Sequence, residues 1–335
     1  MTVVLGVEGG GSHTHAVVAD AEGRVLGAGG SDDPSNWEDV GIGAASAAIR
    51  AVVREALDGA RRHPGDVEAA VFGLAGVDFP IDEQRLSGIP DAIGLTGRTS
   101  ILNDGFVAMR AGTDDRFGVV VVAGTGSVVA GRNPAGEVFR TLGMGPTFGD
   151  WGSASEISAA AVTAVADAHL RRGPQTALSR LLCEKTGVQT VVEFLEATGR
   201  GRIDDTTFAP IVAQAADAGD ACARSILSSS GERLGATASH VVRMLDMENL
   251  AFDLVLAGGI FRSGSAELMT AIEKAVHATA PNARLVSLDI PPVVGCVLLA
   301  LEDAGSQTPQ GFRETLGKEA SSALGIGPAS SPAAL

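Results

Sequence analysis

The stretch GVVVVAGTGSVVAG, residues 118–131, decides the fold. Four valines lead into Gly-Thr-Gly-Ser and two more valines follow, which predicts two buried strands joined by a glycine-rich turn. A plain two-residue hairpin would usually take Asn-Gly or Asp-Gly at this point. The turn therefore needs another explanation.

A second copy of this pattern lies at the start of the chain. Residues 3–29 (VVLGVEGGGSHTHAVVADAEGRVLGAG) and 119–143 (VVVVAGTGSVVAGRNPAGEVFRTLG) both predict a strand, a glycine turn, a second strand, a polar turn and a third strand. Gly11 and Gly126 take matching places. The duplication predicts two similar α/β domains, while β-meanders are common enough that a chance match is the alternative.

Glycines in a fixed turn need a reason, since each destabilises the fold by about 0.5–1 kcal/mol relative to alanine. They are expected where φ must be positive or where a ligand approaches the backbone. Exposed amides in such a turn form an anion-binding nest. One turn alone favours a tight hairpin, but the pair predicts two phosphate-binding turns on opposite walls of a cleft. The sequence has no GxxxxGK[ST] motif, and its GGG run lacks the GxGxxG spacing.

Composition limits the partners of the protein. With 335 residues, 45% of them hydrophobic, the chain is long enough for about two domains. The net charge of −15 argues against nucleic acid and anionic membranes as partners. We expect neither a signal peptide nor a membrane span. Because Cys183, Cys222 and Cys296 are far apart, we expect a cytoplasmic protein without a cysteine metal cluster.

The pattern along the chain predicts the order of the elements. Strands and turns alternate over 3–30, followed by a helix at 40–60 and a strand at 67–75. Ala-rich helices fill 153–245, and the last helix is expected at 293–304. The predicted domains are 1–117, with the first phosphate turn, and 118–312, with the second. The last helix is a candidate to pack back on the first domain, and 313–335 is expected to be a flexible tail.

Five segments, in order, carry a family resemblance: GVEGGGSHTHAVVAD, LND, VVAGTGS, MGPTFGDWGSASEI and LVLAGGIFRSG. They resemble the N-acetylglucosamine kinase and BadF/BadG group of the actin, sugar-kinase and Hsp70 superfamily, over about residues 3–305. The resemblance implies two ribonuclease-H-like domains flanking a nucleotide cleft, with ATP and Mg²⁺ as cofactors. It also implies that the sugar lies on the side of 1–117 and that the adenosine site belongs to 118–312. We also expect a homodimer.

The resemblance also implies roles for particular residues. Asp104 matches the catalytic base, and Glu8 would reach Mg²⁺ through water. The ATP-binding set would be Gly9, Gly10, Gly11, Ser12, Gly124, Thr125, Gly126, Gly258, Gly259 and Phe261. The sugar-binding set would be Asn36, Trp37, Asp104, Ser127, Val128, Gly143 and Asp150. Trp151, Val128 and Pro146 depart from the family pattern beside the expected sugar, so the resemblance does not select the sugar.

Three sets of candidate residues also have structural explanations. In Asn-Asp-Gly, Asp104 follows an apolar strand, where a carboxylate can accept the proton of an attacking hydroxyl; the alternative is a helix cap. Trp37 and Trp151, both in polar loops, are candidate sugar platforms or plugs between loop and core. His13 and His15 alternate on one strand face, but with no third ligand evident ordinary polar contacts are favoured over a metal pair.

The function predicted from these features is an ATP-dependent kinase acting on the primary hydroxyl of an amino sugar, N-acetylglucosamine or glucosamine. The alternatives are a BadF-type ATPase activator and a non-catalytic sugar or nucleotide sensor. The activators hold an iron–sulfur cluster through closely spaced cysteines, which this sequence lacks.

Overall fold

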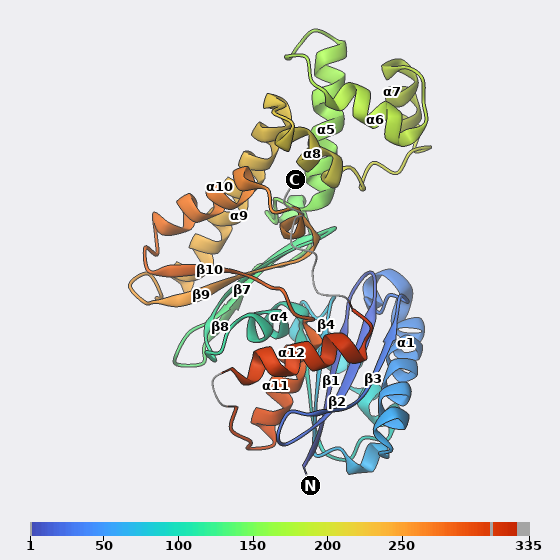
Figure 1. The fold of residues 1–335 in the computed structure, drawn as a ribbon, viewed down its shortest axis with the longest axis vertical. Helices are drawn as coiled ribbons and strands as arrows, with labels where there is room; N and C mark the ends of the chain where they lie inside the picture. Colours follow the sequence, from blue (N-terminus) through green and yellow to red (C-terminus); the bar gives the residue numbers. More distant parts are fainter. Residues whose placement is uncertain (1, 309–310, 327–335) are drawn as a thin grey trace. The chain divides into compact units, whose positions relative to one another are not determined.

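The computed structural model describes residues 2–308 and 311–326, which divide into two compact units. Unit 1 comprises the described residues of Met1–Val120 and Val286–Ser331, and unit 2 comprises Val121–Leu285. Each unit is built on one five-stranded sheet with helices (Figure 1).

The sheet of unit 1 has the strand order β3-β2-β1-β4-β5. Strand β1 pairs antiparallel with β2 and parallel with β4, and β4 pairs parallel with β5. The elements of this unit are β1 (Val3–Gly9), β2 (Thr14–Asp20), β3 (Val25–Ser31), α1 (Trp37–Ala60), η1 (Pro64–Asp66), β4 (Ala69–Leu74), α2 (Pro80–Leu86), α3 (Gly88–Ile93), β5 (Arg98–Asn103), α4 (Asp104–Gly112), α11 (Val293–Asp303) and α12 (Phe312–Ala323).

The sheet of unit 2 has the order β10-β9-β6-β7-β8. Its strands are β6 (Gly118–Ala123), which begins in unit 1, β7 (Ser127–Arg132), β8 (Val138–Arg140), β9 (Phe252–Ala257) and β10 (Ala283–Ser287). Numbered along the chain within each unit, both sheets have the order 3-2-1-4-5. The repeated order and the mixed sheets confirm the predicted α/β class of two ribonuclease-H-like domains.

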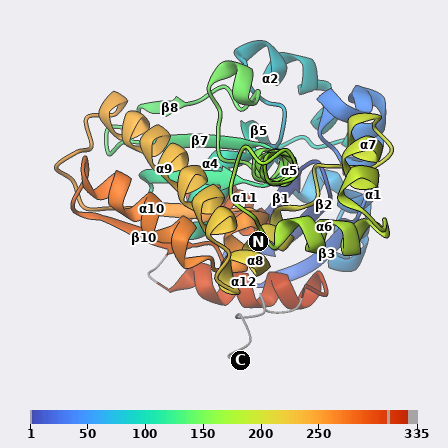
Figure 2. The same ribbon diagram turned by 90° about the horizontal axis from the view of Figure 1, so that it is seen from above.

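The helices of unit 2 follow its three-stranded meander. They are η2 (Pro146–Phe148), α5 (Ala154–His169), α6 (Leu178–Thr186), α7 (Val191–Gly199), α8 (Ala209–Asp217), α9 (Ala221–Met244), η3 (Gly259–Ser263) and α10 (Ala266–His277). Helices α9 and α10 pack side by side (Figure 2). A Cβ on Gly231 of α9 would lie 2.8 Å from the Cβ of Ala271, so the small residues permit this close packing.

Alternation along β1 divides the core of unit 1 into two layers. Val3, Leu5 and Val7 pack with α1 on one face of the sheet, and Val4 packs with α4, α11 and α12 on the other. Gly6 belongs to the second face, where an added Cβ would meet the backbone nitrogen of Val297 at 2.7 Å. The closely packed layers hold the carboxyl end of β1 in place.

Three features differ from the sequence-based expectation. Helix α1 begins at Trp37 rather than at residue 40, because Asn36 caps it, and it contains a break at Gly41, where φ is +80°. Helix α12 lies in the predicted flexible tail and buries Leu316 and Ala320, so that expectation was wrong for these residues. Residues 327–335 of the predicted tail lie outside the described residues.

No helix in the described part of the chain is both long and apolar enough to cross a membrane. All three cysteines are free thiols, and Cys183 and Cys296 are buried. Burial raises the pKa of the Cys296 thiol far above its ordinary value, which keeps this thiol protonated and unreactive.

Candidate functional site

The carboxyl ends of three parallel strands meet at one edge of the unit 1 sheet. Gly9 at the end of β1 pairs in register with Leu74 of β4, and Leu74 pairs with Asn103 of β5. The turn 10–13, the loop 75–79 and Asp104 therefore all leave the sheet at one level. This is the edge at which open α/β sheets bind ligands.

Asn103, and not Asp104, caps helix α4. Its Oδ1 accepts a hydrogen bond from the Gly105 amide at 3.0 Å, and its Nδ2 donates to the Val77 carbonyl at 3.3 Å and to Asp78 Oδ1 at 3.2 Å. Asp104 takes the first helical position and is half-buried. The helix cap that the sequence offered as an alternative role for Asp104 is thus made by Asn103. The Asp104 carboxylate lies where the helix dipole favours negative charge.

Asn36 and Trp37 start helix α1 beside this edge. The backbone amide of Asn36 donates to the Gly10 carbonyl at 3.1 Å. Trp37 Nε1 donates to the Gly76 carbonyl at 2.7 Å, and Asn103 Nδ2 donates to the Val77 carbonyl of the same loop. Backbone carbonyls thus connect the first glycine turn, the start of α1 and the start of α4 into one cluster within unit 1.

Trp37 contacts both the core and polar groups. The indole packs on the apolar core between the sheet and α1 and is half-buried. Its other surroundings are polar, with the Arg85 guanidinium 5.5 Å from the ring centroid. The packing role is therefore observed, and the role as a sugar platform stays a prediction.

The glycines of the first turn differ in what fixes them. A Cβ on Gly9 would collide with Ser35 Oγ, so packing excludes a side chain there. Around Gly10 the nearest atom to an added Cβ is Glu8 Oε1 at 3.8 Å, and around Gly11 it is Asp39 Oδ2 at 3.9 Å. Neither Gly10 nor Gly11 has a positive φ. Backbone strain and packing therefore do not account for these two glycines.

The second turn, in unit 2, has the same property. An added Cβ on Gly124 or Gly126 would have no atom within 4 Å, and neither residue has a positive φ. Of the two reasons expected for glycine in these turns, a positive φ does not apply to Gly124 or Gly126. The turn is tied to the start of α5, because the Gly124 carbonyl accepts from the Ala154 amide at 2.8 Å and the Thr125 carbonyl from Ser155 Oγ at 2.8 Å.

Asp150 is buried and holds the loop before it. Its Oδ2 accepts from the Met144 amide at 2.9 Å, and its own amide donates to the Gly145 carbonyl at 3.2 Å. At Gly143, where φ is +74°, an added Cβ would lie 3.5 Å from Val128. Asp150 therefore has a visible structural role in the loop that carries Gly143.

Trp151 follows Asp150 and stays more open than Trp37. The residue is 40% exposed, and the Arg233 guanidinium lies 4.3 Å from the ring centroid. Its carbonyl accepts from Ser127 Oγ at 3.2 Å, which links this loop to the second glycine turn.

The predicted adenosine segment packs on the strand that leads into the second turn. At Gly258 φ is +108°, and an added Cβ would collide with the Ala123 carbonyl. Only glycine fits this close approach. Phe261 is 8% exposed and belongs to the core around η3. Gly258, Gly259 and the turn at Gly124 are thus neighbours within unit 2.

The predicted residues form two groups, each within one unit. Unit 1 carries Glu8, the turn Gly9–Ser12, Asn36, Trp37 and Asp104. Unit 2 carries the turn Gly124–Ser127, Val128, Gly143, Asp150, Gly258, Gly259 and Phe261. That the two turns face each other across a cleft stays a prediction.

Two hollows lie away from these groups. One, of about 590 Å³, is open and lined by residues of 179–191. Another, of about 250 Å³, is lined by Arg110, Phe312 and Arg313 among others. No predicted site residue lines either hollow.

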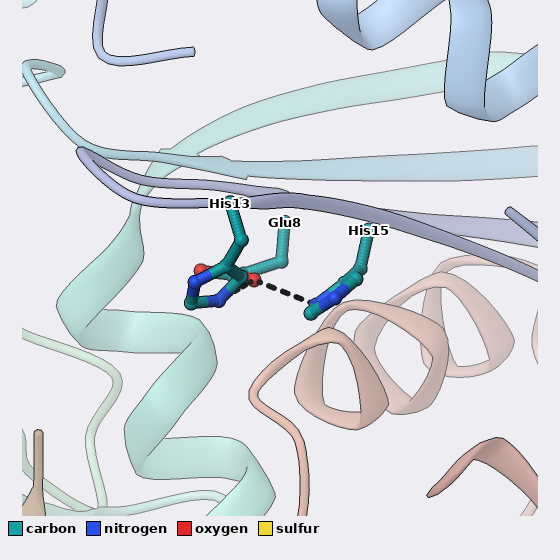
Figure 3. Close-up of side chains that lie close together, drawn as sticks. All are labelled: Glu8, His13 and His15. Carbon is teal, nitrogen blue, oxygen red and sulfur yellow. Dashed lines mark ion pairs between the residues drawn. The ribbon is translucent and has the colours of Figure 1, made fainter. Parts of the chain in front are cut away.

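The structure supplies a partner set for Glu8 that sequence reasoning missed. Its carboxylate, nearly buried, lies beside the rings of His13 and His15 (Figure 3). Burial by itself would raise the pKa of the Glu8 carboxyl, but His13 and His15 together hold it below its ordinary value. The sequence signal for this set was the i, i+2 spacing of His13 and His15 after the turn. That spacing points to Glu8 only when the pairing of β1 with β2 is known, because Glu8 pairs with His15.

Two units of this topology, each with a glycine turn after its first strand, define the two-domain α/β fold typical of actin-like ATPases. A model of the BadF/BadG/BcrA/BcrD ATPase family matches residues 5–300, and the chain belongs to this family. Membership implies ATP binding.

Several characterised or solved proteins are similar over nearly the whole chain. An N-acetylmuramic acid/N-acetylglucosamine kinase of Clostridium acetobutylicum is 25% identical over 90% of this chain and 98% of its own length. An N-acetyl-D-glucosamine kinase of Dictyostelium discoideum is 29% identical over 89% and 98%. The crystal structure of a protein described as a putative N-acetylglucosamine kinase from Chromobacterium violaceum superposes with a TM-score of 0.67 at 22% identity, covering 90% of this chain and 99% of that one.

Proposed function

We propose that the protein is an ATP-dependent kinase that phosphorylates the primary hydroxyl of an amino sugar, N-acetylglucosamine or glucosamine, with Asp104 as the general base. The observation that carries this proposal is the position of Asp104. Asp104 begins α4 where the parallel strands of the sheet end, while Asn103 caps the helix. The similarity to two amino-sugar kinases supports the same substrate class.

The acceptor side of the reaction is assigned to unit 1. Asn36 and Trp37 would orient the sugar near Asp104, which takes the proton from the hydroxyl. The hydroxyl oxygen then bonds to the γ-phosphorus, the bond to the β–γ bridging oxygen breaks, and ADP leaves with that electron pair. The remaining role of the protein is to position the reactants and to stabilise charge.

The glycine turns are assigned to the phosphates. Gly10, Gly11, Gly124 and Gly126 keep open space where a side chain would stand, which supports close approach of a ligand to their amides. Gly258 and Gly259, packed beside the second turn, are assigned to the adenosine.

The residues at the end of β1 fit a magnesium ion held through water. Glu8 Oε1 lies toward the first turn, 3.8 Å from where a Cβ on Gly10 would stand. Mg²⁺ prefers oxygen ligands and retains several waters. When bound, it would neutralise charge on the β- and γ-phosphates.

The proposed sugar set is completed by four residues of unit 2: Ser127, Val128, Gly143 and Asp150. We also propose a cytoplasmic homodimer.

An ADP-release assay over glucosamine, N-acetylglucosamine, N-acetylmuramic acid, N-acetylmannosamine, glucose and cyclitols tests the proposal. ADP release should depend on an amino sugar and should fall with Asp104→Asn. ADP release that no sugar accelerates would favour an ATPase activator, and binding of ATP or sugar without turnover would favour a sensor.

A further inference from the structure

Unit 1 also contains a cluster of side chains that can bind a metal ion, made of Glu8, His13 and His15. Glu8 and His15 are directly paired across β1 and β2, so their side chains leave the sheet on the same face. His13 lies two residues before His15 and shares that face. The three side chains point toward one another (Figure 3), and their ligand atoms all lie within 4.8 Å of one another.

The spacing of these atoms matches the ligands of one metal ion. Glu8 Oε2 lies 3.2 Å from His13 Nε2 and 3.6 Å from His15 Nδ1. Ligands about 2.0–2.2 Å from a tetrahedral ion are separated by about 3.3–3.6 Å along each edge of the tetrahedron. The two distances therefore agree with two edges of such a site.

Two of the three atoms are buried without a hydrogen bond. Glu8 Oε2 and His15 Nδ1 have no hydrogen-bond partner among the described residues, and the side chains are 7% and 15% exposed. An unsatisfied buried polar atom is unfavourable. One cation at the centre would satisfy both of these atoms at once, with His13 Nε2 as a third ligand, whereas a proton shared between Glu8 and one imidazole joins only two of the three groups.

The surroundings orient the rings for this role. The second ring nitrogen of His13, Nδ1, lies 3.1 Å from Ser12 Oγ, an outer contact of the kind that orients a metal-binding imidazole. Gly30 of β3 pairs with His15 of β2. A Cβ added to Gly30 would lie 3.2 Å from the His15 ring, so the glycine leaves room for this ring.

We propose that Glu8, His13 and His15 bind a divalent transition-metal ion of the zinc type, with a fourth position for water or another ligand. Two imidazoles and one carboxylate suit Zn²⁺, Co²⁺ or Ni²⁺ better than Mg²⁺ or Ca²⁺. Because Glu8 precedes the first glycine turn and His13 follows it, the ion would join the two ends of that turn. The ion would take Glu8 Oε2, beside the two imidazoles, whereas the magnesium proposal uses Glu8 Oε1, near Gly10. The two proposals thus share one carboxylate, and binding of the zinc-type ion does not depend on kinase activity.

The site is tested by isothermal titration calorimetry, in which ZnCl₂ is added to untagged full-length protein that has been treated with EDTA. We expect one Zn²⁺ per chain, a rise in melting temperature with Zn²⁺, and no displacement by a large excess of Mg²⁺. His13→Ala and His15→Ala should each weaken binding by at least about tenfold. His63→Ala and His169→Ala, which remove exposed histidines elsewhere, should bind as the wild type does.

Co²⁺ provides a second readout, since a tetrahedral site with nitrogen and oxygen ligands gives visible absorption bands. These bands should appear in the wild type and vanish in His13→Ala. The ring of His13 is 32% exposed, so this variant decides the matter if His15→Ala fails to fold. Circular dichroism in EDTA should show that His13→Ala is folded. Absence of stoichiometric Zn²⁺ binding, or wild-type affinity in folded His13→Ala, would overturn the proposal.

Discussion

The Gly10 carbonyl accepts a hydrogen bond from the backbone amide of Asn36 at 3.1 Å. The first glycine turn and the start of α1 are therefore linked directly through their backbones. The residue proposed to bind the sugar is fixed to the turn proposed to bind phosphate, which suits a site that must align a hydroxyl with a phosphoryl group.

Asn36→Ser separates the two tasks of this residue. In the wild type, Asn36 Oδ1 caps α1 by accepting a hydrogen bond from the Glu38 amide. A serine can also cap the helix, and it leaves the backbone contact with Gly10 intact. It removes the side-chain amide that we propose contacts the sugar. We expect the KM for sugar to rise about tenfold, the effect of losing roughly one hydrogen bond, with the melting temperature nearly unchanged. An unchanged KM would remove Asn36 from the sugar site.

Gly9 and Gly10 form a matched pair of variants. Gly9→Ala should lower stability by about 1–3 kcal/mol, since its Cβ would displace buried Ser35. Gly10→Ala should keep wild-type stability, because the Cβ meets open space, yet it should weaken ATP use at least about tenfold if phosphate lies against that backbone. Thermal melts and the KM for ATP distinguish the two outcomes. Normal ATP use by Gly10→Ala would argue that the turn is only a hairpin.

Asp104→Asn should lower turnover by about 10²–10⁴, the usual loss for a general base, with little change in the affinity for ATP. Asp58→Asn, which alters an exposed aspartate of α1, serves as the control and should keep wild-type turnover. Near-normal turnover of Asp104→Asn would show that another group takes the proton.

Sugar binding should change the intrinsic tryptophan fluorescence. Trp37→Phe should lose much of this change, and it should lose about 1 kcal/mol of stability with its hydrogen bond to Gly76. Trp151→Phe, which leaves Trp37 in place, should retain the Trp37 signal. Identical responses in the wild type and Trp37→Phe would place the sugar elsewhere.

Much of the fold was predictable because valine strands and glycine turns are local signals that occur twice. Helix α12 was not, since its Ala- and Ser-rich sequence resembles a linker and only Leu316, Gly317 and Ala320 are buried in it. Gly317 is fixed by a residue distant in sequence, because an added Cβ would meet Ile290 at 2.7 Å.

In the candidate site, the position of Asp104 after a strand was predictable, but its separation from the cap was not. The cap depends on which of two adjacent polar residues faces the Gly105 amide, and the structure assigns it to Asn103. The trio around Glu8 was missed for a similar reason. Its third member is brought to the histidines by the pairing of Glu8 with His15 between two strands, which the order of residues alone does not reveal.

The claim that this chain transfers a phosphoryl group to a sugar is tested most directly by ³¹P NMR of a reaction with ATP, Mg²⁺ and N-acetylglucosamine or glucosamine. The proposed function predicts one sugar 6-phosphate for each ADP formed, almost no inorganic phosphate, and loss of both products with Asp104→Asn. ADP accompanied by an equal amount of inorganic phosphate, with no phosphosugar from either substrate, would contradict it.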